Sequence, residues 1–225
     1  MIEYKTISLA NQVYEQLEYN ILCGNYAAGE VISESRLSEE LGVSRTPIRE
    51  ALAKLEHERL IKDSPMGTVV VGVSENDVKD LFEVKRRLEV IATRRAAENI
   101  SEQGLTALKD NVEQQEFYAQ KGDVYKVRDL DTEFHDIIYS ECGSTTFETI
   151  MSPIHHKMMK FRRISLERPH RIVDSVAEHR AIYDAIAEKD IDKLETIMLI
   201  HIDHAYNSIM EGSEQYGTDD STKDH

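Results

Sequence analysis

Two short stretches near the N-terminus carry apolar residues every three or four positions, the spacing of one face of an α-helix. The first runs from about Arg36 to Leu41. Gly42 follows it, where a helix end favours a positive φ, and Ser44 is a favourable N-cap for the second stretch. The apolar side chains of that second stretch are Ile48, Leu52 and Leu55. The pattern predicts two helices joined by a tight turn, an arrangement that can place one helix in the major groove of DNA.

The polar side chains near the start of the second predicted helix are suited to contact DNA. Arg45 and Arg49 can each place a guanidinium on the O6 and N7 atoms of guanine, and the hydroxyl of Thr46 can bond a phosphate. Arg36, on the preceding helix, adds a further positive charge. Exposed arginines are common, so a plain solvated surface is the alternative interpretation of these residues taken alone.

Turn-forming residues separate two β-prone runs downstream of these helices. The runs are residues 60–62 and 68–73, and the segment between them includes Pro65 and Gly67. This is the signature of a β-hairpin. We expect the hairpin to form a wing, with Gly67 close to DNA, and to end a DNA-binding domain at residues 1–73.

The rest of the chain shows only helical periodicity. It extends from Ser74 to about Ile209 and predicts about six helices in a bundle, within a second domain at residues 74–211. The polar composition of residues 212–225 predicts a disordered tail. The expected breaks between helices fall at residues 99–101, 121–123, 143–145, 168–170 and 189–190.

The net charge of −15 over 225 residues argues against a nucleic-acid partner, because phosphates repel acidic surfaces. The distribution weakens this objection, since residues 36–62 are nearly neutral, with lysine and arginine slightly outnumbering glutamate. We therefore expect strongly salt-dependent binding to a matched DNA site, with weak affinity for random DNA.

The cysteines and the apolar runs constrain the location of the protein. Cys23 and Cys142 lie far apart, which provides neither a disulfide framework nor the spacing of a zinc site. No apolar run approaches the ~20 residues that a membrane-spanning helix needs. We expect a cytoplasmic protein without a membrane partner.

The N-terminal region resembles the winged helix-turn-helix of the GntR family of bacterial transcription regulators. The phrases that carry the resemblance are GVSRTPIREAL with a following LE-x-E-x-LI, and upstream VYEQLEYNILCGNYAAGEVI. Two positions depart from the family pattern: Arg59 stands where glycine is usual, and Met66 stands where a basic residue is common. The second departure predicts a weaker contact of the wing with the minor groove.

The C-terminal region resembles the FCD ligand-sensing domain of the FadR-type GntR regulators. The matching phrases are LFEVKRRLE, DTEFHDII, RIVDSVAEHRAIYDAI and MLIHIDHA, spread over nearly the whole region. The resemblance implies an all-α antiparallel bundle around a central effector cavity. The expected fold is therefore mainly α, with an N-terminal winged helix-turn-helix and a C-terminal all-α antiparallel helical bundle.

Four ionisable residues of the second region lie where the helical period turns side chains inward. Asp131 and His135 share one edge of a buried face, while His179 and His201 fall within the apolar stripes of two later helices. A single such histidine is most often a hydrogen-bonded core residue. Four together favour a divalent ion such as Zn²⁺ or Ni²⁺, because a buried aspartate without a cation is costly. The metal-binding subset of FCD domains uses an aspartate and three histidines in these phrases.

The resemblance also implies an effector. In FCD domains a small organic acid commonly reaches the open coordination positions through its carboxylate, assisted by cationic side chains. The candidates here are Lys85 and Arg171. Lys85 stands where arginine is usual, so a forked carboxylate contact becomes a contact with a single point charge.

Two other functions compete with a sensor. His135 and Asp136 form an HD dipeptide, which is typical of metal-dependent phosphohydrolases, but the helical period turns Asp136 away from the buried face. No HExxH motif, nucleophile elbow or phosphate-binding glycine loop occurs. A purely architectural dimer with structural histidines is the third possibility. We expect a homodimeric, effector-responsive regulator, usually a repressor in this family, that binds a palindromic operator and is not an enzyme.

Overall fold

The computed structural model describes residues 8–65 and 67–217, with side chains described as far as Glu211. The chain divides into two compact units, Met1–Ser74 and Glu75–His225. The expectation of a mainly helical fold is confirmed, and the strands among the described residues belong to one small sheet of the first unit. Among the described helices, none is both long enough and apolar enough to span a bilayer.

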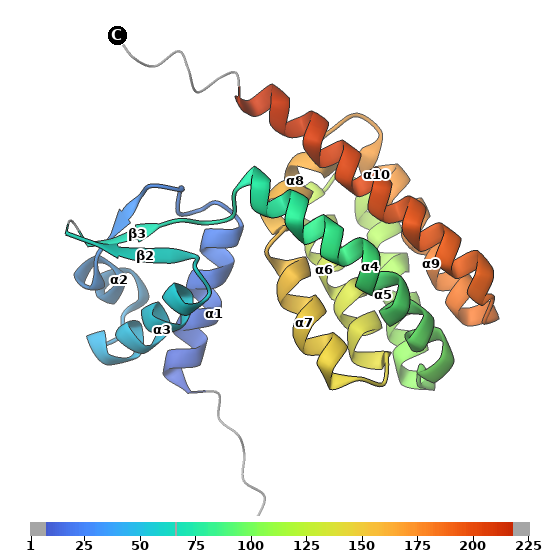
Figure 1. Ribbon diagram of the computed structural model, residues 1–225, viewed down its shortest axis with the longest axis horizontal. Helices are drawn as coiled ribbons and strands as arrows, with labels where there is room; N and C mark the ends of the chain where they lie inside the picture. Colours follow the sequence, from blue (N-terminus) through green and yellow to red (C-terminus); the bar gives the residue numbers. More distant parts are fainter. Residues whose placement is uncertain (1–7, 66, 218–225) are drawn as a thin grey trace, which may run out of the picture. The chain divides into compact units, whose positions relative to one another are not determined.

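The first unit is a three-helix core with a three-stranded antiparallel sheet (Figure 1). The central strand of the sheet is β3, flanked by β1 and β2. The fully buried side chains of the first unit include Leu17, Ile32, Leu37, Ile48 and Leu55. Its elements are α1 Leu9–Leu22, β1 Val31–Ile32, α2 Glu34–Leu41, α3 Arg45–His57, β2 Ile61–Ser64 and β3 Gly67–Val70.

The turn between α2 and α3 forms as its residues predict. Gly42 adopts the left-handed conformation with φ 66°, and Ser44 has the extended backbone of an N-cap, although its side chain makes no capping bond. Strand β1 was not expected from the sequence. It is only two residues long and exists because Val31 and Ile32 pair with β3.

Two residues of the hairpin region, Arg59 and Gly67, have a positive φ. Arg59, which stands where the GntR pattern has glycine, adopts a positive φ of 63°. Gly67 begins β3 with φ 118°, and a Cβ added there would lie 3.3 Å from a methyl group of Val31. Both positions therefore favour glycine sterically, and only Gly67 has it. Met66 lies outside the described residues, so its predicted effect on the wing stays a prediction.

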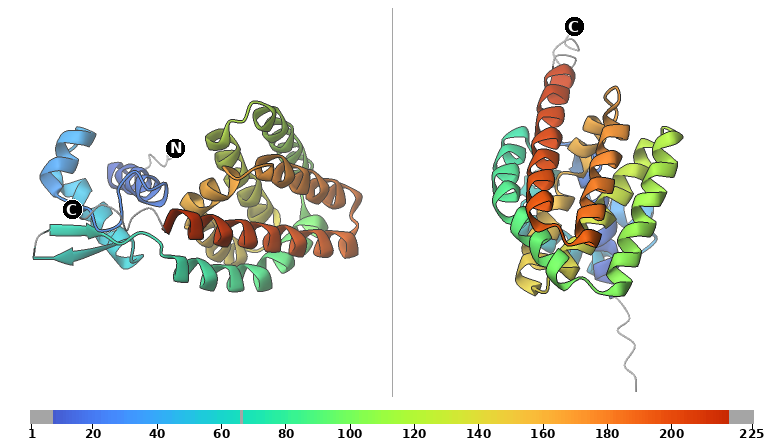
Figure 2. Two further views of the ribbon diagram at one scale, coloured as in Figure 1. Left: turned by 90° about the horizontal axis from the view of Figure 1, so that it is seen from above. Right: turned by 90° about the vertical axis from the view of Figure 1, so that its right-hand side faces the viewer.

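The second unit is a helical bundle (Figures 1 and 2). Helix α5 packs on α6 and α9, and α4 packs on α10. The fully buried side chains of the second unit include Phe134, Ile138, Tyr139 and Ile182. The helices are α4 Glu75–Asn99, α5 Glu102–Gln120, α6 Val124–Glu141, α7 Thr145–His156, α8 Met159–Leu166, α9 Arg171–Glu188 and α10 Ile191–Gly217.

The structure corrects two expectations for this unit. The predicted helix between residues 145 and 168 is interrupted at Lys157 and Met158, so the unit has one described helix more than expected. At this interruption the carbonyl of His155 accepts from the Met158 N–H at 3.2 Å and from Arg162 at 2.8 Å. The predicted disordered tail is wrong for residues 212–217, because α10 continues through them to Gly217. A single glycine such as Gly212 destabilises a helix by only about 1 kcal/mol relative to alanine, so it does not have to end α10. The remaining residues, 218–225, lie outside the described part of the chain.

Candidate functional site

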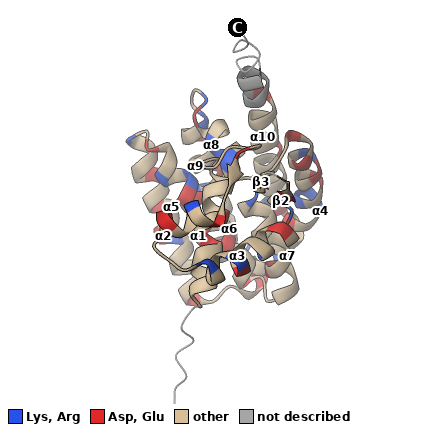
Figure 3. Cartoon of the chain, turned by 90° about the vertical axis from the view of Figure 1, so that its left-hand side faces the viewer, with Lys and Arg blue, Asp and Glu red and all other residues tan. Residues whose placement is uncertain are grey.

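The predicted DNA contacts gather around the turn of the first unit. Arg45, Thr46 and Arg49 lie exposed on the first turns of α3, and Arg36 lies exposed on α2. Figure 3 shows positive and negative residues interspersed over α2 and α3. The fold therefore leaves the predicted reading side chains accessible, in a surface of mixed charge.

Carboxylates on or beside α2 hold two of these arginines. Glu34 accepts two bonds from Arg49 Nε, at 2.8 and 2.9 Å. Arg36 bonds Glu30 and Glu40, each at 2.6 Å. Arg45 instead donates to the hydroxyl of Ser35 at 3.0 Å. Exposed ion pairs of this kind are worth only ~0.2–1 kcal/mol, so DNA phosphates and bases can displace them.

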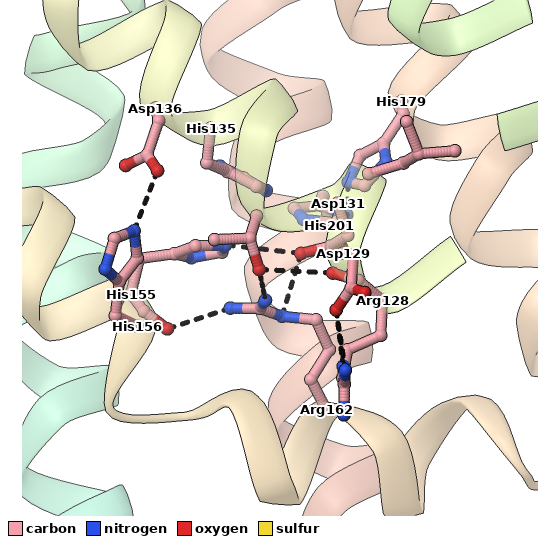
Figure 4. Close-up of polar contacts among 12 residues, drawn as sticks. Arg128, Asp129, Asp131, His135, Asp136, His155, His156, Arg162, His179 and His201 are labelled. Atoms are coloured by element: carbon pink, nitrogen blue, oxygen red, sulfur yellow. Dashed lines mark hydrogen bonds and ion pairs between the residues drawn. The ribbon is translucent and has the colours of Figure 1, made fainter. Parts of the chain in front are cut away.

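The four predicted metal ligands come together inside the second unit (Figure 4). Asp131 and His135 project from α6, His179 from α9 and His201 from α10, and all four are buried. One nitrogen from each histidine lies within 4.8 Å of the others. Oδ2 of Asp131 lies 3.6 Å from Nε2 of His179. The helical period placed these residues correctly on the inward faces.

In each of the three histidines an acceptor oxygen lies beside Nδ1, which leaves Nε2 available as a ligand. Nδ1 of His201 lies 2.7 Å from a carboxylate oxygen of Glu178, and Nδ1 of His179 lies 2.7 Å from the amide oxygen of Gln115. Nδ1 of His135 lies 2.8 Å from a carboxylate oxygen of Glu89, at an angle unsuitable for a hydrogen bond. An acceptor facing Nδ1 favours a proton there, which leaves the Nε2 lone pair free.

Two buried nitrogen atoms support a metal at this position. Nε2 of His135 and Nε2 of His179 have no hydrogen-bond partner among the described residues. Burying such atoms without a partner is costly, and a divalent ion would satisfy both. The donor set of three imidazoles and one carboxylate is one that Zn²⁺ and Ni²⁺ accept. The residues present therefore fit a metal ion.

The ionisation states suit metal binding. Burial lowers the pKa of His135 and, still further, the pKa of His179, so both imidazoles stay neutral. Burial acts to raise the pKa of Asp131, but the charge of the Arg162 guanidinium outweighs it, and the pKa lies below its usual value. Neutral imidazoles and an ionised carboxylate are the forms that coordinate a metal.

His155 belongs to the same cluster, although the sequence did not place it. Its Nε2 lies 3.2 Å from Oδ1 of Asp131, which Arg162 Nε also contacts at 2.8 Å. Its Nδ1 lies 2.8 Å from Nζ of Lys85. Both ring nitrogens are therefore occupied by protein groups. The interruption after α7 obscured the direction of His155, because the helical period ends one residue beyond it.

The two predicted effector contacts, Lys85 and Arg171, line a small buried cavity beside the metal ligands. Its volume is about 30 Å³, which is enough to hold a water molecule. Lys85 Nζ lies 2.9 Å from Glu89, and Arg171 forms two bonds of 3.0 Å to Glu178. Arg162 is a third cation at this cavity, which the sequence did not predict. Each of the three already has a carboxylate partner.

The HD dipeptide does not form a joint ligand pair. The carboxylate of Asp136 is half-buried and lies 2.7 Å from Nε2 of His156, apart from the histidine cluster (Figure 4). Hydrogen bonding by His156 outweighs burial and lowers the pKa of Asp136. Asp136 therefore points away from the histidine cluster, as expected, but its carboxylate faces α7 rather than solvent.

Two family models match the chain. The model of the gntR family of bacterial regulatory proteins matches residues 9–71, and the FCD domain model matches residues 80–204. The HTH-type transcriptional regulator YdhC of Bacillus subtilis is 28% identical over 196 residues, which cover 86% of this chain and 87% of YdhC. The gluconate operon transcriptional repressor of Bacillus subtilis is 26% identical over 184 residues, 80% of this chain and 76% of the repressor.

Solved structures share the fold. The structure of E. coli McbR/YncC superposes with a TM-score of 0.81 and covers 94% of this chain and 100% of its own. The sequence identity is 22%, so the likeness concerns the arrangement of the chain alone.

Proposed function

Because the chain belongs to the gntR family of bacterial regulatory proteins and carries an FCD domain, we propose that it is a cytoplasmic repressor that responds to a small organic acid at a metal centre. The family consists of transcriptional regulators rather than enzymes, and its FCD domains bind effectors. Repression is proposed by analogy with the gluconate operon repressors among its relatives.

For DNA, we propose that two copies of the first unit read a palindromic operator. The exposed Arg45, Thr46 and Arg49 on α3 would contact the major groove, while Arg36 and Gly67 approach the backbone and the minor groove. A homodimer with twofold symmetry requires two half-sites of inverted sequence.

For the effector, the observation that carries the proposal is the convergence of three imidazole nitrogens within 4.8 Å, two of them buried and unbonded. His135, His179, His201 and Asp131 would hold the ion, which supplies a Lewis-acidic centre for a carboxylate.

Charge balance gives the ion its role in anion binding. Three ion pairs already neutralise the cationic side chains at the cavity: the buried pairs Lys85 with Glu89 and Arg162 with Asp131, and the partly buried pair Arg171 with Glu178. A divalent ion adds positive charge that no other described side chain at the cavity offsets. An acid larger than a water molecule must also enlarge the cavity of about 30 Å³. We propose that this enlargement shifts the bundle between two packings that differ in operator affinity.

Native mass spectrometry with elemental analysis of the purified protein tests the metal and the dimer together. The expected result is a dimer with one divalent ion per chain, released by a chelator. In vitro selection of DNA fragments should then yield an inverted repeat. A protein that carries no ion after exposure to Zn²⁺ and Ni²⁺ would refute the metal centre, and selection of no common sequence would refute operator binding.

A further inference from the structure

A row of buried polar side chains leads from the backbone of α6 to the histidine cluster. Asn111 and Gln115 lie one turn apart on α5, and both are almost fully buried. Asn111 Nδ2 donates to the carbonyl of Leu130 at 3.1 Å, Gln115 Nε2 donates to Asn111 Oδ1 at 2.7 Å, and Gln115 Oε1 lies 2.7 Å from Nδ1 of His179. Neither amide takes part in the functions described above.

The direction of this relay is fixed at its far end. A backbone carbonyl can only accept, and so can the carboxylate of Glu133, which lies 3.3 Å from the same nitrogen of Asn111. Asn111 must therefore turn its NH₂ group toward them and its oxygen toward Gln115. Gln115 must then donate with its nitrogen, so its oxygen faces His179. Two side-chain amides that could each be flipped are thus set in one orientation by a group that cannot be flipped.

We infer that Gln115 is a positioning residue that holds His179 in the Nδ1-protonated tautomer and presents Nε2 to a metal ion. The inference rests on the proposed metal centre for the identity of the group that Nε2 meets. His179 differs here from His201, because a neutral amide rather than a carboxylate accepts its Nδ1 proton. Since the buried Asp131 and Glu89 and the partly buried Glu178 already contribute negative charge, a neutral partner orients His179 without adding to it.

The first measurement is the tautomer of His179 in the metal-free protein, read from long-range ¹H–¹⁵N correlation spectra of histidine-labelled samples. The wild type should show the Nδ1-protonated form. Gln115→Leu should shift His179 toward a mixture of tautomers, whereas Leu108→Ala, which leaves Asn111 and Gln115 in place, should retain the wild-type form. An Nε2-protonated His179 in the wild type would overturn the inference whether or not the variants fold.

The second measurement is Zn²⁺ affinity, from competition with a chromophoric chelator. Gln115→Leu should bind Zn²⁺ about 10–100-fold more weakly than the wild type, as expected for loss of a partner behind a ligating histidine. Leu108→Ala is the matched control, because Leu108 is a fully buried residue of the same helix whose apolar side chain cannot hydrogen-bond a histidine. It should lower stability but change Zn²⁺ affinity less than about 3-fold. Equal losses of Zn²⁺ affinity in both variants would show that Gln115 acts only through packing.

The two measurements separate this inference from the proposed function. If the wild type binds no Zn²⁺ but shows the expected tautomers, the metal centre is refuted and the amide relay stands. If Zn²⁺ binds and Gln115→Leu changes neither the tautomer nor the affinity, the metal centre stands and the role of Gln115 is refuted.

Discussion

Arg171 and Glu178 lie two turns apart on α9 and are joined by two hydrogen bonds of 3.0 Å. The same carboxylate faces Nδ1 of His201 at 2.7 Å and Nδ1 of His204 at 2.9 Å. Arg171 is therefore anchored to the group that orients a proposed metal ligand. An effector that recruits Arg171 must disturb this arrangement, which would couple ligand binding to the histidine cluster.

Glu178 should contribute to stability in a defined pH range. Burial acts to raise its pKa, but hydrogen bonds and charges from His201 and Arg171 outweigh it and lower the pKa from 4.5 to about 2. A lowered carboxyl pKa stabilises the fold above the unfolded value, and that stability is lost as the pH falls toward 2. Relative to wild type, Glu178→Gln should lower the free energy of unfolding by about 3 kcal/mol at pH 6 and by under half of that at pH 3. Urea unfolding of the chelator-treated proteins measures this difference. A difference independent of pH would show that the carboxylate charge is not what stabilises the site.

His201 and His204 provide a matched pair for testing the metal site. Both lie on α10 and both contact Glu178, but His201 is buried in the cluster while the side chain of His204 is 57% exposed. His201→Ala should weaken Zn²⁺ binding at least about 100-fold, because it removes one of four protein ligands. His204→Ala should change the affinity less than about 3-fold. Calorimetric titration with Zn²⁺ measures both values. Equal affinities in the two variants would place the ion elsewhere.

Much of the fold was predictable because local signals determine it. Gly42 and Ser44 set the turn of the DNA-binding unit from their own backbone preferences, without help from distant residues. The inward direction of His179 and His201 followed from helical period alone. Strand β1 could not be predicted in this way, since two residues become a strand only through pairing with a segment more than 30 positions later.

The partners of the predicted ligands were not predictable from the same signals. Glu89, Gln115 and Glu178 lie on α4, α5 and α9, and their distances to the histidines depend on how those helices pack. His155 was ambiguous because α7 ends one residue after it. Helical period gives the face of each helix, whereas the contacts between faces require the tertiary structure.

Arg59→Gly should stabilise the first unit. The left-handed conformation costs a residue with a Cβ roughly 1–2 kcal/mol, and the greater freedom of glycine in the unfolded chain offsets roughly 0.5–1 kcal/mol of the gain. The expected net effect is an increase of about 1 kcal/mol in unfolding free energy, measured by urea unfolding. Arg59→Ala keeps the Cβ and should give no such gain, so it separates the backbone effect from loss of the arginine side chain.

Lys85 and Glu89 should behave as an energetically coupled pair. Both are buried, and Lys85 Nζ contacts Glu89 and His155. Lys85→Met leaves a buried carboxylate without its cation and should lower the free energy of unfolding by about 3–5 kcal/mol. The double variant with Glu89→Gln should recover about 2 kcal/mol relative to the sum of the single effects. Additive effects in urea unfolding would instead indicate that the charge of Lys85 is free to serve an anionic effector.

Glu34 and operator DNA should compete for Arg49. In the described structure Arg49 Nε bonds both carboxylate oxygens of Glu34, and the guanidinium lowers the pKa of that carboxyl. Because the Arg49 side chain is 65% exposed, it can leave Glu34 and contact DNA with little loss of other contacts. If Arg49 contacts a phosphate or a guanine, a variant without Arg49 should release fewer counterions when it binds DNA.

Arg49→Ala should therefore weaken operator binding and reduce the slope of log K against log salt by about 1 in magnitude, whereas Glu34→Gln should strengthen binding by about 2–5-fold. Fluorescence anisotropy with the operator obtained by in vitro selection, at several salt concentrations, measures both effects. Arg87→Ala is the control, because Arg87 is an exposed arginine of the second unit that is likewise paired with a glutamate, Glu83. An unchanged slope in Arg49→Ala would exclude this arginine from the reading surface, since a cation that leaves the counterion balance unaltered does not contact the DNA.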